Sequence, residues 1–298
     1  MSDATIYLLW DGLQFLINGL TQGSIYALVA LGYTMVYGII RLVNFAHGEF
    51  LMLGSMGAFY AYRFGLPLPI VLLTAIAVAA FFALLTEKCV YRPVRNENRI
   101  TSLMTAIGAS LFFQYSGQVL FGASPKKLPD LIEEKYFNFY DVSISSSQLL
   151  IIGMTLVVML LLYLLVHFTK IGKAMRAVSF NPKAAELSGI NTQFVISFTF
   201  FIGAALAGLS GVLLSNIMTV EPLMGTMLGL KAFIAAVLGG IGHIPGAFLG
   251  GLILGIFENL VAGFYKASFR DIVSFVILIV LLMIRPQGIL GKNQREKI

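Results

Sequence analysis

Long apolar stretches recur along almost the whole chain, and they constrain the fold more than any other feature. Of the 298 residues, 58% are hydrophobic and 11% are charged, whereas soluble domains carry about 25% charged residues. Stretches of about 20 apolar residues can cross a bilayer as helices. We place spans at 13–40, 45–62, 67–85, 102–121, 149–168, 194–217, 229–241, 245–263 and 268–285. The sequence therefore predicts an all-α, polytopic membrane protein with about eight or nine transmembrane segments, some of them short or interrupted.

The loops between these spans are too short for a separate soluble domain. We therefore expect residues 1–298 to form a single transmembrane domain, with an outer loop at 122–148 and a cytoplasmic loop at 169–193. Residues 1–12 contain no lysine or arginine, which a cleavable signal peptide needs at its start, so the first span should remain in the mature protein. Cys89 is the single cysteine, which excludes an internal disulfide.

The distribution of lysine and arginine predicts the orientation of the chain. These residues collect in loops 86–101 and 169–193 and after residue 285, whereas loop 122–148 has three lysines against four acidic residues. Because cytoplasmic loops carry the excess of positive charge, we expect the N-terminus outside and the C-terminus in the cytoplasm. This topology and anionic membrane lipid account for the net charge of +6, and no nucleic-acid partner is expected.

Small residues recur four positions apart in two of the predicted spans. Such stripes let helix backbones approach closely, which helps transmembrane helices to associate in lipid. We therefore expect helix packing at Gly203, Ala207, Gly211, Gly246, Gly250, Gly251 and Gly255.

Two glycine-punctuated segments share the pattern Gly, any residue, Phe, Leu. They are NFAHGEFLMLG at 44–54 and GHIPGAFLGGL at 242–252. Interrupted helices at matching places in two halves of a transporter point to the translocation site, so the shared pattern suggests an internal repeat. Asn44, His47 and Glu49 lie in the first segment and are candidate pathway or gating residues; the alternative is a solvated helix start.

Glu258 and Asn259 lie about a dozen residues from the inner end of their span, and therefore deep in the bilayer. An ionisable group at that depth costs several kcal/mol, so it normally faces the bundle interior or a watery path. We expect Glu258 to face the interior, with Asn259 beside it on a different face, and count both as pathway candidates. No cation of the chain is evidently placed to pair with Glu258.

Several catalytic and nucleotide-binding motifs are absent. The sequence contains no G-x-x-x-x-G-K-[ST] phosphate-binding loop, so the chain is not expected to hydrolyse ATP, and no H-E-x-x-H or G-x-S-x-G motif. His243 has no second metal ligand near it in the sequence, and no metal site is expected. Three classes remain: a subunit of a pump powered by partners, a stand-alone secondary carrier or channel, and a membrane enzyme with an unrecognised site.

A short capped helix is predicted within the cytoplasmic loop. Asn181 is a good N-cap, Pro182 suits the first helical position, and Gly189 supplies a left-handed stop. Residues Ala184, Ala185 and Glu186 favour a helix between them. So short a helix is marginal alone in water, so we expect it to pack against a partner protein or to rest on the bilayer surface.

The chain resembles the membrane permease subunits of ATP-binding-cassette importers for branched-chain amino acids. The resemblance is carried by GSIYALVALGYTMVYGIIRLVNFAHGEF, CVYRPVR, KAAELSGIN, KAFIAAVLGGIGHIPGAFLGGLILGIFE and RPQGILG, and so runs nearly end to end. It implies an importer subunit in a bacterial or archaeal plasma membrane, or, in close relatives, a permease for urea or short amides. At His243 we would expect a small residue such as serine.

The resemblance also implies the partners of the chain. They are a second related permease, two cytoplasmic ATPase subunits and an external substrate-binding protein. ATP and magnesium would bind the ATPase subunits, with no cofactor on this chain. The loop helix that contains Asn181, Pro182, Ala184, Ala185, Glu186 and Gly189 would couple the permease to the ATPase.

Overall fold

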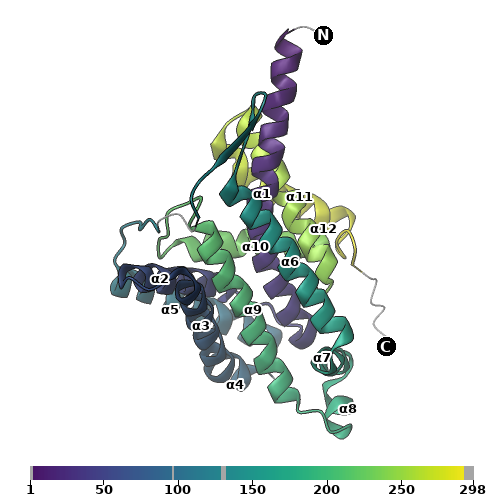
Figure 1. Ribbon diagram of the computed structural model, residues 1–298. Coiled ribbons are helices and arrows are strands. Elements are labelled where there is room, and N and C mark those ends of the chain that lie inside the picture. Colours follow the sequence, from purple (N-terminus) through teal and green to yellow (C-terminus); the bar gives the residue numbers. More distant parts are fainter. Residues whose placement is uncertain (1–2, 96, 129–131, 292–298) are drawn as a thin grey trace.

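The protein is a bundle of helices with one small β-hairpin (Figure 1). A computed structural model describes residues 3–95, 97–128 and 132–291. The longer helices are α1 (Asp3–Ile40), α2 (His47–Arg63), α3 (Leu68–Thr86), α5 (Arg99–Phe121), α6 (Ser146–Phe168), α7 (Lys170–Phe180), α9 (Thr192–Leu214), α10 (Met224–Gly239), α11 (Ile244–Phe264) and α12 (Arg270–Ile284). Shorter elements are η1 (Glu87–Tyr91), α4 (Arg92–Val94), α8 (Pro182–Leu187), η2 (Ala267–Phe269) and the strands β1 (Tyr136–Phe139) and β2 (Val142–Ser145).

Six helical segments of the described chain are long and apolar enough to cross a membrane. They are Leu8–Ile40, Leu68–Val94, Ser146–Phe168, Thr192–Leu214, Ile244–Phe264 and Ala267–Ile284. Helix α10 is a shorter apolar helix, and the spans expected at 45–62 and 102–121 form α2 and α5, which are not among the six. This confirms the expectation of a polytopic helical membrane protein that contains short segments.

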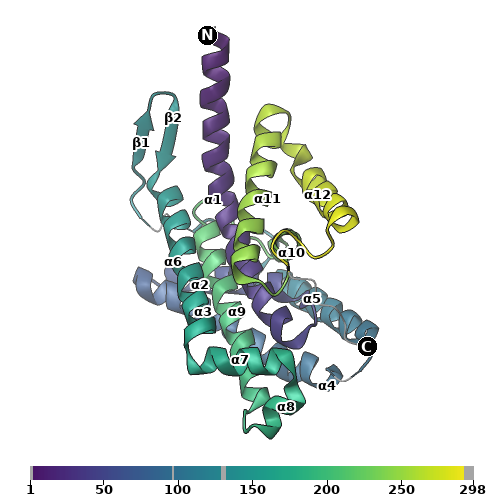
Figure 2. The same cartoon turned by 90° about the vertical axis from the view of Figure 1, so that its right-hand side faces the viewer.

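Helices α1 and α11 lie side by side along the centre of the molecule (Figure 2). Glycines face each other at this contact: a Cβ placed on Gly255 would lie 2.3 Å from the Cα of Gly23, and one on Gly251 would lie 2.5 Å from the Cα of Ala27. The two backbones are therefore in direct van der Waals contact, and no side chain larger than hydrogen fits at Gly251 or Gly255.

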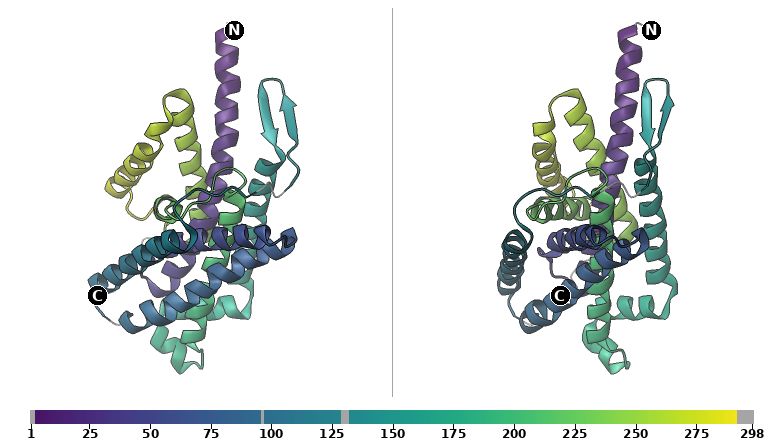
Figure 3. Two further views of the ribbon diagram at one scale, coloured as in Figure 1. Left: turned by 90° about the vertical axis from the view of Figure 1, so that its left-hand side faces the viewer. Right: turned by 60° about the vertical axis from the view of Figure 1, so that its left-hand side comes forward.

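Helices α2, α3 and α5 form a group on one side of the central helices and cross them at a steep angle (Figure 3). Helix α9 lies between this group and α1, and it is packed closely on both. A Cβ on Gly208 of α9 would lie 2.7 Å from the carbonyl oxygen of Ala75 in α3. Close backbone contacts through small residues are thus repeated across the bundle.

Both long loops contain structure that the sequence analysis did not anticipate. The loop 122–148 contains the antiparallel hairpin β1–β2, in which Phe139 pairs with Val142, and the ring of Tyr140 stacks on Trp10 of α1 with 5.3 Å between ring centroids. The loop 169–193 contains α7 before the expected short helix. Thr169 begins α7 by accepting a hydrogen bond from the backbone N–H of Gly172, and its buried face comprises Gly172, Met175 and Val178.

The segment after α12 folds back onto the end of α10. The backbone N–H of Ile289 donates to the carbonyl of Leu238 at 2.8 Å, and that of Leu290 donates to Gly239 at 3.1 Å. These bonds satisfy two carbonyl groups that the end of α10 would otherwise leave without partners. The motif RPQGILG therefore has a structural role at the junction of α10 and α11.

Replacement of a glycine at the α1–α11 contact should destabilise the protein. In the Gly251→Leu variant, the side chain would meet the backbone of Ala27 and force the helices apart. Overpacking of this kind costs on the order of 1–3 kcal/mol. We expect a lower midpoint of thermal unfolding of the detergent-solubilised protein. As a control, Gly153→Ala on α6, where no atom lies within 4 Å of the new Cβ, should leave the midpoint unchanged or raise it slightly; an equal fall in both variants would contradict the packing role.

Candidate functional site

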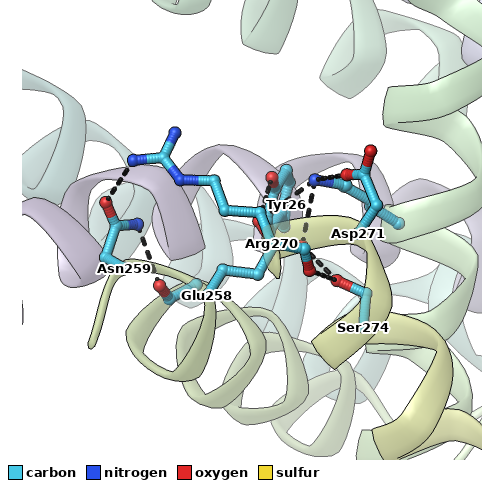
Figure 4. A network of polar contacts seen from close by, with 8 residues as sticks. Tyr26, Glu258, Asn259, Arg270, Asp271 and Ser274 are labelled. Carbon is cyan, nitrogen blue, oxygen red and sulfur yellow. Dashed lines mark hydrogen bonds and ion pairs between the residues drawn. The ribbon is translucent and has the colours of Figure 1, made fainter. Parts of the chain in front are cut away.

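Glu258 is the centre of a buried polar network. Its carboxylate is 0% exposed, and it accepts hydrogen bonds from the hydroxyls of Tyr26 (2.7 Å) and Ser274. The ammonium group of Lys231 lies 3.1 Å from Oε1 of Glu258. The carboxylate thus faces the interior of the bundle, where it contacts side chains from α1, α10 and α12 (Figure 4).

The expectation that Glu258 has no cationic partner was wrong. Lys231 belongs to the short helix α10, and its ammonium group also pairs with Asp271 of α12 at 2.8 Å. The sequence did contain the signal, because Lys231 is a charged residue inside an apolar span, and such residues normally have a partner in the bundle. A partner was missed because α10 and α11 are separate spans, and only their packing brings the two side chains together.

Asn259 connects this network to the start of α12. Its amide donates to the carbonyl of Gly255 at 3.0 Å, and its oxygen accepts from the guanidinium of Arg270 at 3.3 Å. Figure 4 shows Asn259 and Arg270 on one side of Glu258, and Asp271 and Ser274 on the other. The network therefore joins α11 to the start of α12, through Arg270, Asp271 and Ser274.

The polar residues at the start of α2 are buried, which excludes the solvated helix start that was the alternative. Asn44 and His47 are each 1% exposed, and Glu49 is 0% exposed. The side chain of Asn44 accepts from the N–H of Ala46 at 3.1 Å and from the hydroxyl of Tyr91 at 3.0 Å, so it shapes the turn that leads into α2. The ring of His47 lies against Tyr33, with 4.6 Å between ring centroids.

Glu49 forms a second buried polar centre, with partners different in kind from those of Glu258. One carboxylate oxygen, Oε1, accepts hydrogen bonds from Ser110 (3.1 Å) and Thr226 (2.9 Å). The other, Oε2, has no hydrogen-bond partner in the described part of the chain. In this same part of the chain, no group of three or more His, Cys, Asp or Glu is arranged to hold a metal ion.

The two glycine-punctuated segments occupy related positions. Each one begins a helix, α2 or α11, directly after a turn, and each places a glycine against α10: a Cβ on Gly48 would lie 2.1 Å from the carbonyl of Gly225, and one on Gly246 would lie 2.3 Å from that of Gly239. His243 caps α11 by accepting the N–H of Gly246 at 3.0 Å, which is the task that the expected serine would perform.

The other residues of the two small-residue stripes also lie at contacts between helices. A Cβ on Gly203 would lie 3.3 Å from the carbonyl of Gly32 in α1, and one on Gly211 would meet Ser55 of α2 at 2.2 Å. Ala207 is fully buried, and a Cβ on Gly250 would lie 2.1 Å from the carbonyl of Ala235 in α10.

The expected loop helix is present as α8 at the end of the molecule opposite the start of α1 (Figure 2). The side chain of Asn181 accepts the N–H of Ala184 at 3.1 Å, Pro182 is the first helical residue, and Gly189 has φ +80°. Its buried residue is Ala185, and Glu186 accepts a hydrogen bond from Thr192 at the start of α9. Helix α8 is therefore anchored to α9 and follows α7, rather than being isolated.

An open apolar groove lies away from both polar centres. It has a volume of about 720 Å³ and lies between the N-terminal half of α1 and the end of α11, lined by Leu8, Leu9, Trp10, Gly12, Leu13, Leu16, Leu260 and Phe264. Its lining contains none of the candidate pathway residues.

Removal of Lys231 should destabilise the protein more than removal of the charge on Glu258. Lys231→Met would leave a buried carboxylate without a cation, which costs on the order of 3–5 kcal/mol. Glu258→Gln keeps one acceptor oxygen for the hydroxyl of Tyr26 or Ser274, removes the buried negative charge, and leaves Lys231 paired with Asp271. We expect the midpoint of thermal unfolding to be highest for the wild type, lower for Glu258→Gln and lowest for Lys231→Met. The double variant should have a higher midpoint than Lys231→Met alone. The reverse order would show that the ion pair does not stabilise this network.

Comparison with known proteins covers the chain from end to end. Residues 15–282 match the family model described as branched-chain amino acid transport system / permease component. The chain is 42% identical to the high-affinity branched-chain amino acid transport system permease protein LivH of Escherichia coli strain K12, over 100% of both proteins. It is 44% identical to the corresponding protein BraD of Pseudomonas aeruginosa, over 96% of this chain and 98% of the relative.

The fold is similar to that of a solved structure, PsaBC from Streptococcus pneumoniae in complex with Fab. The TM-score is 0.54 at 15% sequence identity, and 95% of this chain and 97% of that chain are covered. A likeness at this identity concerns the fold alone, whereas the matches in sequence extend over nearly every residue. On those matches, the chain belongs to the family of permease components of branched-chain amino acid transport systems.

Proposed function

We propose that the chain is the transmembrane permease subunit of an ATP-driven importer and forms part of the pathway for leucine, isoleucine and valine. The observation that carries this proposal is the full-length identity of 42–44% to permeases named for branched-chain amino acids. The carboxylates of Glu49 and Glu258 lie inside the helical bundle, which suits a polar solute because ionisable groups at such depth normally line a path or pair with one another.

The importer would contain a second related permease, two cytoplasmic ATPase subunits and an external substrate-binding protein. It would lie in a bacterial or archaeal plasma membrane, with the N-terminus outside and the C-terminus in the cytoplasm. ATP and magnesium would bind the ATPase subunits, and this chain would need no cofactor. The positive loops support this orientation, since α7 and α8 carry Lys170, Lys173, Arg176 and Lys183.

Helix α8 would couple this chain to an ATPase subunit. Leu187 at its end is 92% exposed, and Phe180, just before its cap, is 89% exposed. Large apolar side chains so exposed at a polar end of the molecule are typical of a surface that a protein partner covers. The inward side of α8 is held by Ala185 and by the bond between Glu186 and Thr192, so a force on α8 would reach α9.

Two other functions would use the same fold. Urea or short amides are the alternative cargo, since binding proteins select the solute in such importers, and a stand-alone secondary carrier would need no partner. The Glu49 carboxylate, with one oxygen free of hydrogen bonds, favours a solute with a cationic group over neutral urea.

The isolated chain should neither bind nor hydrolyse ATP, because it has no phosphate-binding loop. Uptake of radiolabelled leucine into proteoliposomes should require both ATPase subunits, the second permease and the binding protein. It should also require ATP on the side of the membrane where the ATPase subunits lie. Uptake by this chain alone along an ion gradient would support the carrier instead, and uptake of urea but not leucine by the complete complex would support the other cargo.

Variants in α8 should uncouple ATP hydrolysis from transport. Leu187→Asp changes an exposed side chain with no internal partner to lose, and Gly189→Val strains a residue at φ +80° by about 1–2 kcal/mol. We expect both proteins to reach the membrane, with less ATPase subunit co-purified and lower substrate-stimulated ATPase activity.

Gly153→Val, on the exposed side of α6 with open space around its Cα, is the matched control and should behave like the wild type. Normal co-purification and activity of both α8 variants would mean that this helix rests on the membrane surface instead.

A further inference from the structure

The described part of the chain buries three glutamates, and their partners differ. Glu258 has the cation Lys231 together with two hydroxyl donors. Glu87 has a hydrogen bond on each oxygen, from Gln193 (2.6 Å) and from Ser197 (3.0 Å). Glu49 has two hydroxyl donors on Oε1, no partner on Oε2, and no ion pair with any described lysine or arginine. Of these three glutamates, Glu49 is thus the one that has a carboxylate oxygen without a hydrogen-bond partner and no cation beside it.

The position of Glu49 in the first turn of α2 does not fully compensate the charge of an ionised carboxylate. A negative side chain there is stabilised by the helix dipole, which is equivalent to about half a positive charge. Half a charge and two neutral hydroxyls leave an ionised carboxylate partly uncompensated. Protonation would remove the charge but would add an O–H group that needs its own acceptor. A cationic donor that reaches Oε2 would satisfy both the charge and the free oxygen.

The surroundings of Glu49 combine bare backbone with apolar rings. The backbones of Gly48 in α2 and Gly225 in α10 are in contact. A Cβ on Gly225 would lie 2.8 Å from the carbonyl oxygen of Gly48 and 2.5 Å from Oε2 of Glu49. The ring of Phe50, the residue after Glu49, packs against Phe113 of α5, with 6.3 Å between centroids. A carboxylate near buried aromatic side chains offers partners to two groups of an apolar amino acid, its cationic ammonium group and its hydrocarbon side chain.

Glu49 contacts α10 through two neighbouring residues, Gly225 and Thr226. Thr226 donates to Oε1 from α10, yet Thr226 is itself exposed on the outer side of that helix, next to Met227, which is 45% exposed. In the present arrangement Gly225 covers Oε2. A displacement of the start of α10 away from α2 would break the contact at Gly225 and uncover this oxygen of the carboxylate.

We propose that Glu49 binds the ammonium group of the transported amino acid when α10 moves away from α2. This inference rests on the proposed function, because it assigns a role to one residue of that pathway. The carboxylate of Glu49 replaces water around the ammonium group, and the hydroxyl of Ser110, which belongs to α5 and not to the moving helix, holds the carboxylate in position through Oε1. In the closed arrangement the site is covered by Gly225 and holds no solute.

The test compares Glu49→Gln and Glu49→Asp in the complete importer reconstituted in proteoliposomes. Glutamine keeps the size of the side chain and can accept from Ser110 and Thr226, but it carries no charge. Because hydrogen bonds to charged groups contribute about 1.5–3 kcal/mol, we expect leucine uptake to fall about tenfold or more in Glu49→Gln. The yield of assembled complex and its ATPase activity, stimulated by the loaded binding protein, should stay within about twofold of the wild type. Glu49→Asp should retain more uptake than Glu49→Gln.

The control is Glu221→Gln, which removes a carboxylate from the loop that leads into α10 and should leave uptake unchanged. Normal uptake in Glu49→Gln would overturn the inference, and so would a parallel loss of uptake, stimulated ATPase activity and complex yield, which indicates a structural role. Equal loss in Glu49→Asp and Glu49→Gln would also overturn it, because charge would then not be the feature required. Failure of the wild-type complex to transport leucine would instead refute the proposed function before Glu49 is compared.

Discussion

The close contact between α1 and α11 is the constraint on which the rest of the structure depends. Gly23 and Ala27 of α1 face Gly255 and Gly251 of α11 so closely that their backbones touch. Lipid offers no hydrophobic driving force for helix association, so van der Waals contact along this seam has to hold the two helices together. The same approach brings the hydroxyl of Tyr26 within 2.7 Å of Glu258, and therefore the buried network forms only where the glycines allow it.

Helix α10 is held near its start and in its middle by polar contacts that differ in strength. Near its start, Thr226 reaches Glu49 of α2 through a neutral donor, and glycines keep the two helices in backbone contact. In its middle, Lys231 forms ion pairs with Glu258 and Asp271. A charged pair in a dry environment is harder to separate than a hydroxyl and a carboxylate. The start of α10 is therefore the end that can move, while the middle stays fixed to α11 and α12.

The opposite end of the bundle is organised around the start of α9. Glu186 of α8 binds Thr192, the first residue of α9, and Glu87 binds Gln193 and Ser197 on the next turns. Helix α9 in turn is packed on α1, α2 and α3. The proposed coupling helix α8 is thus joined to α9 by the hydrogen bond between Glu186 and Thr192, and α9 contacts the helices that carry the polar residues of the interior. Physical continuity of this kind is what coupling between a loop helix and a distant site requires.

The sequence by itself determined the membrane class, most of the helices, and the short helix of loop 169–193. These features depend on local chemistry: apolar length for the spans, Asn181 and Pro182 for the start of α8, and a left-handed Gly189 for its end. The hairpin in loop 122–148 was missed because it packs on α1, which is distant in sequence. The partners of Glu258 and Glu49 were decided only by the tertiary structure. Lys231 is 27 residues from Glu258, and Thr226 is 177 residues from Glu49, so no local pattern could reveal which buried carboxylate finds a cation and which one does not.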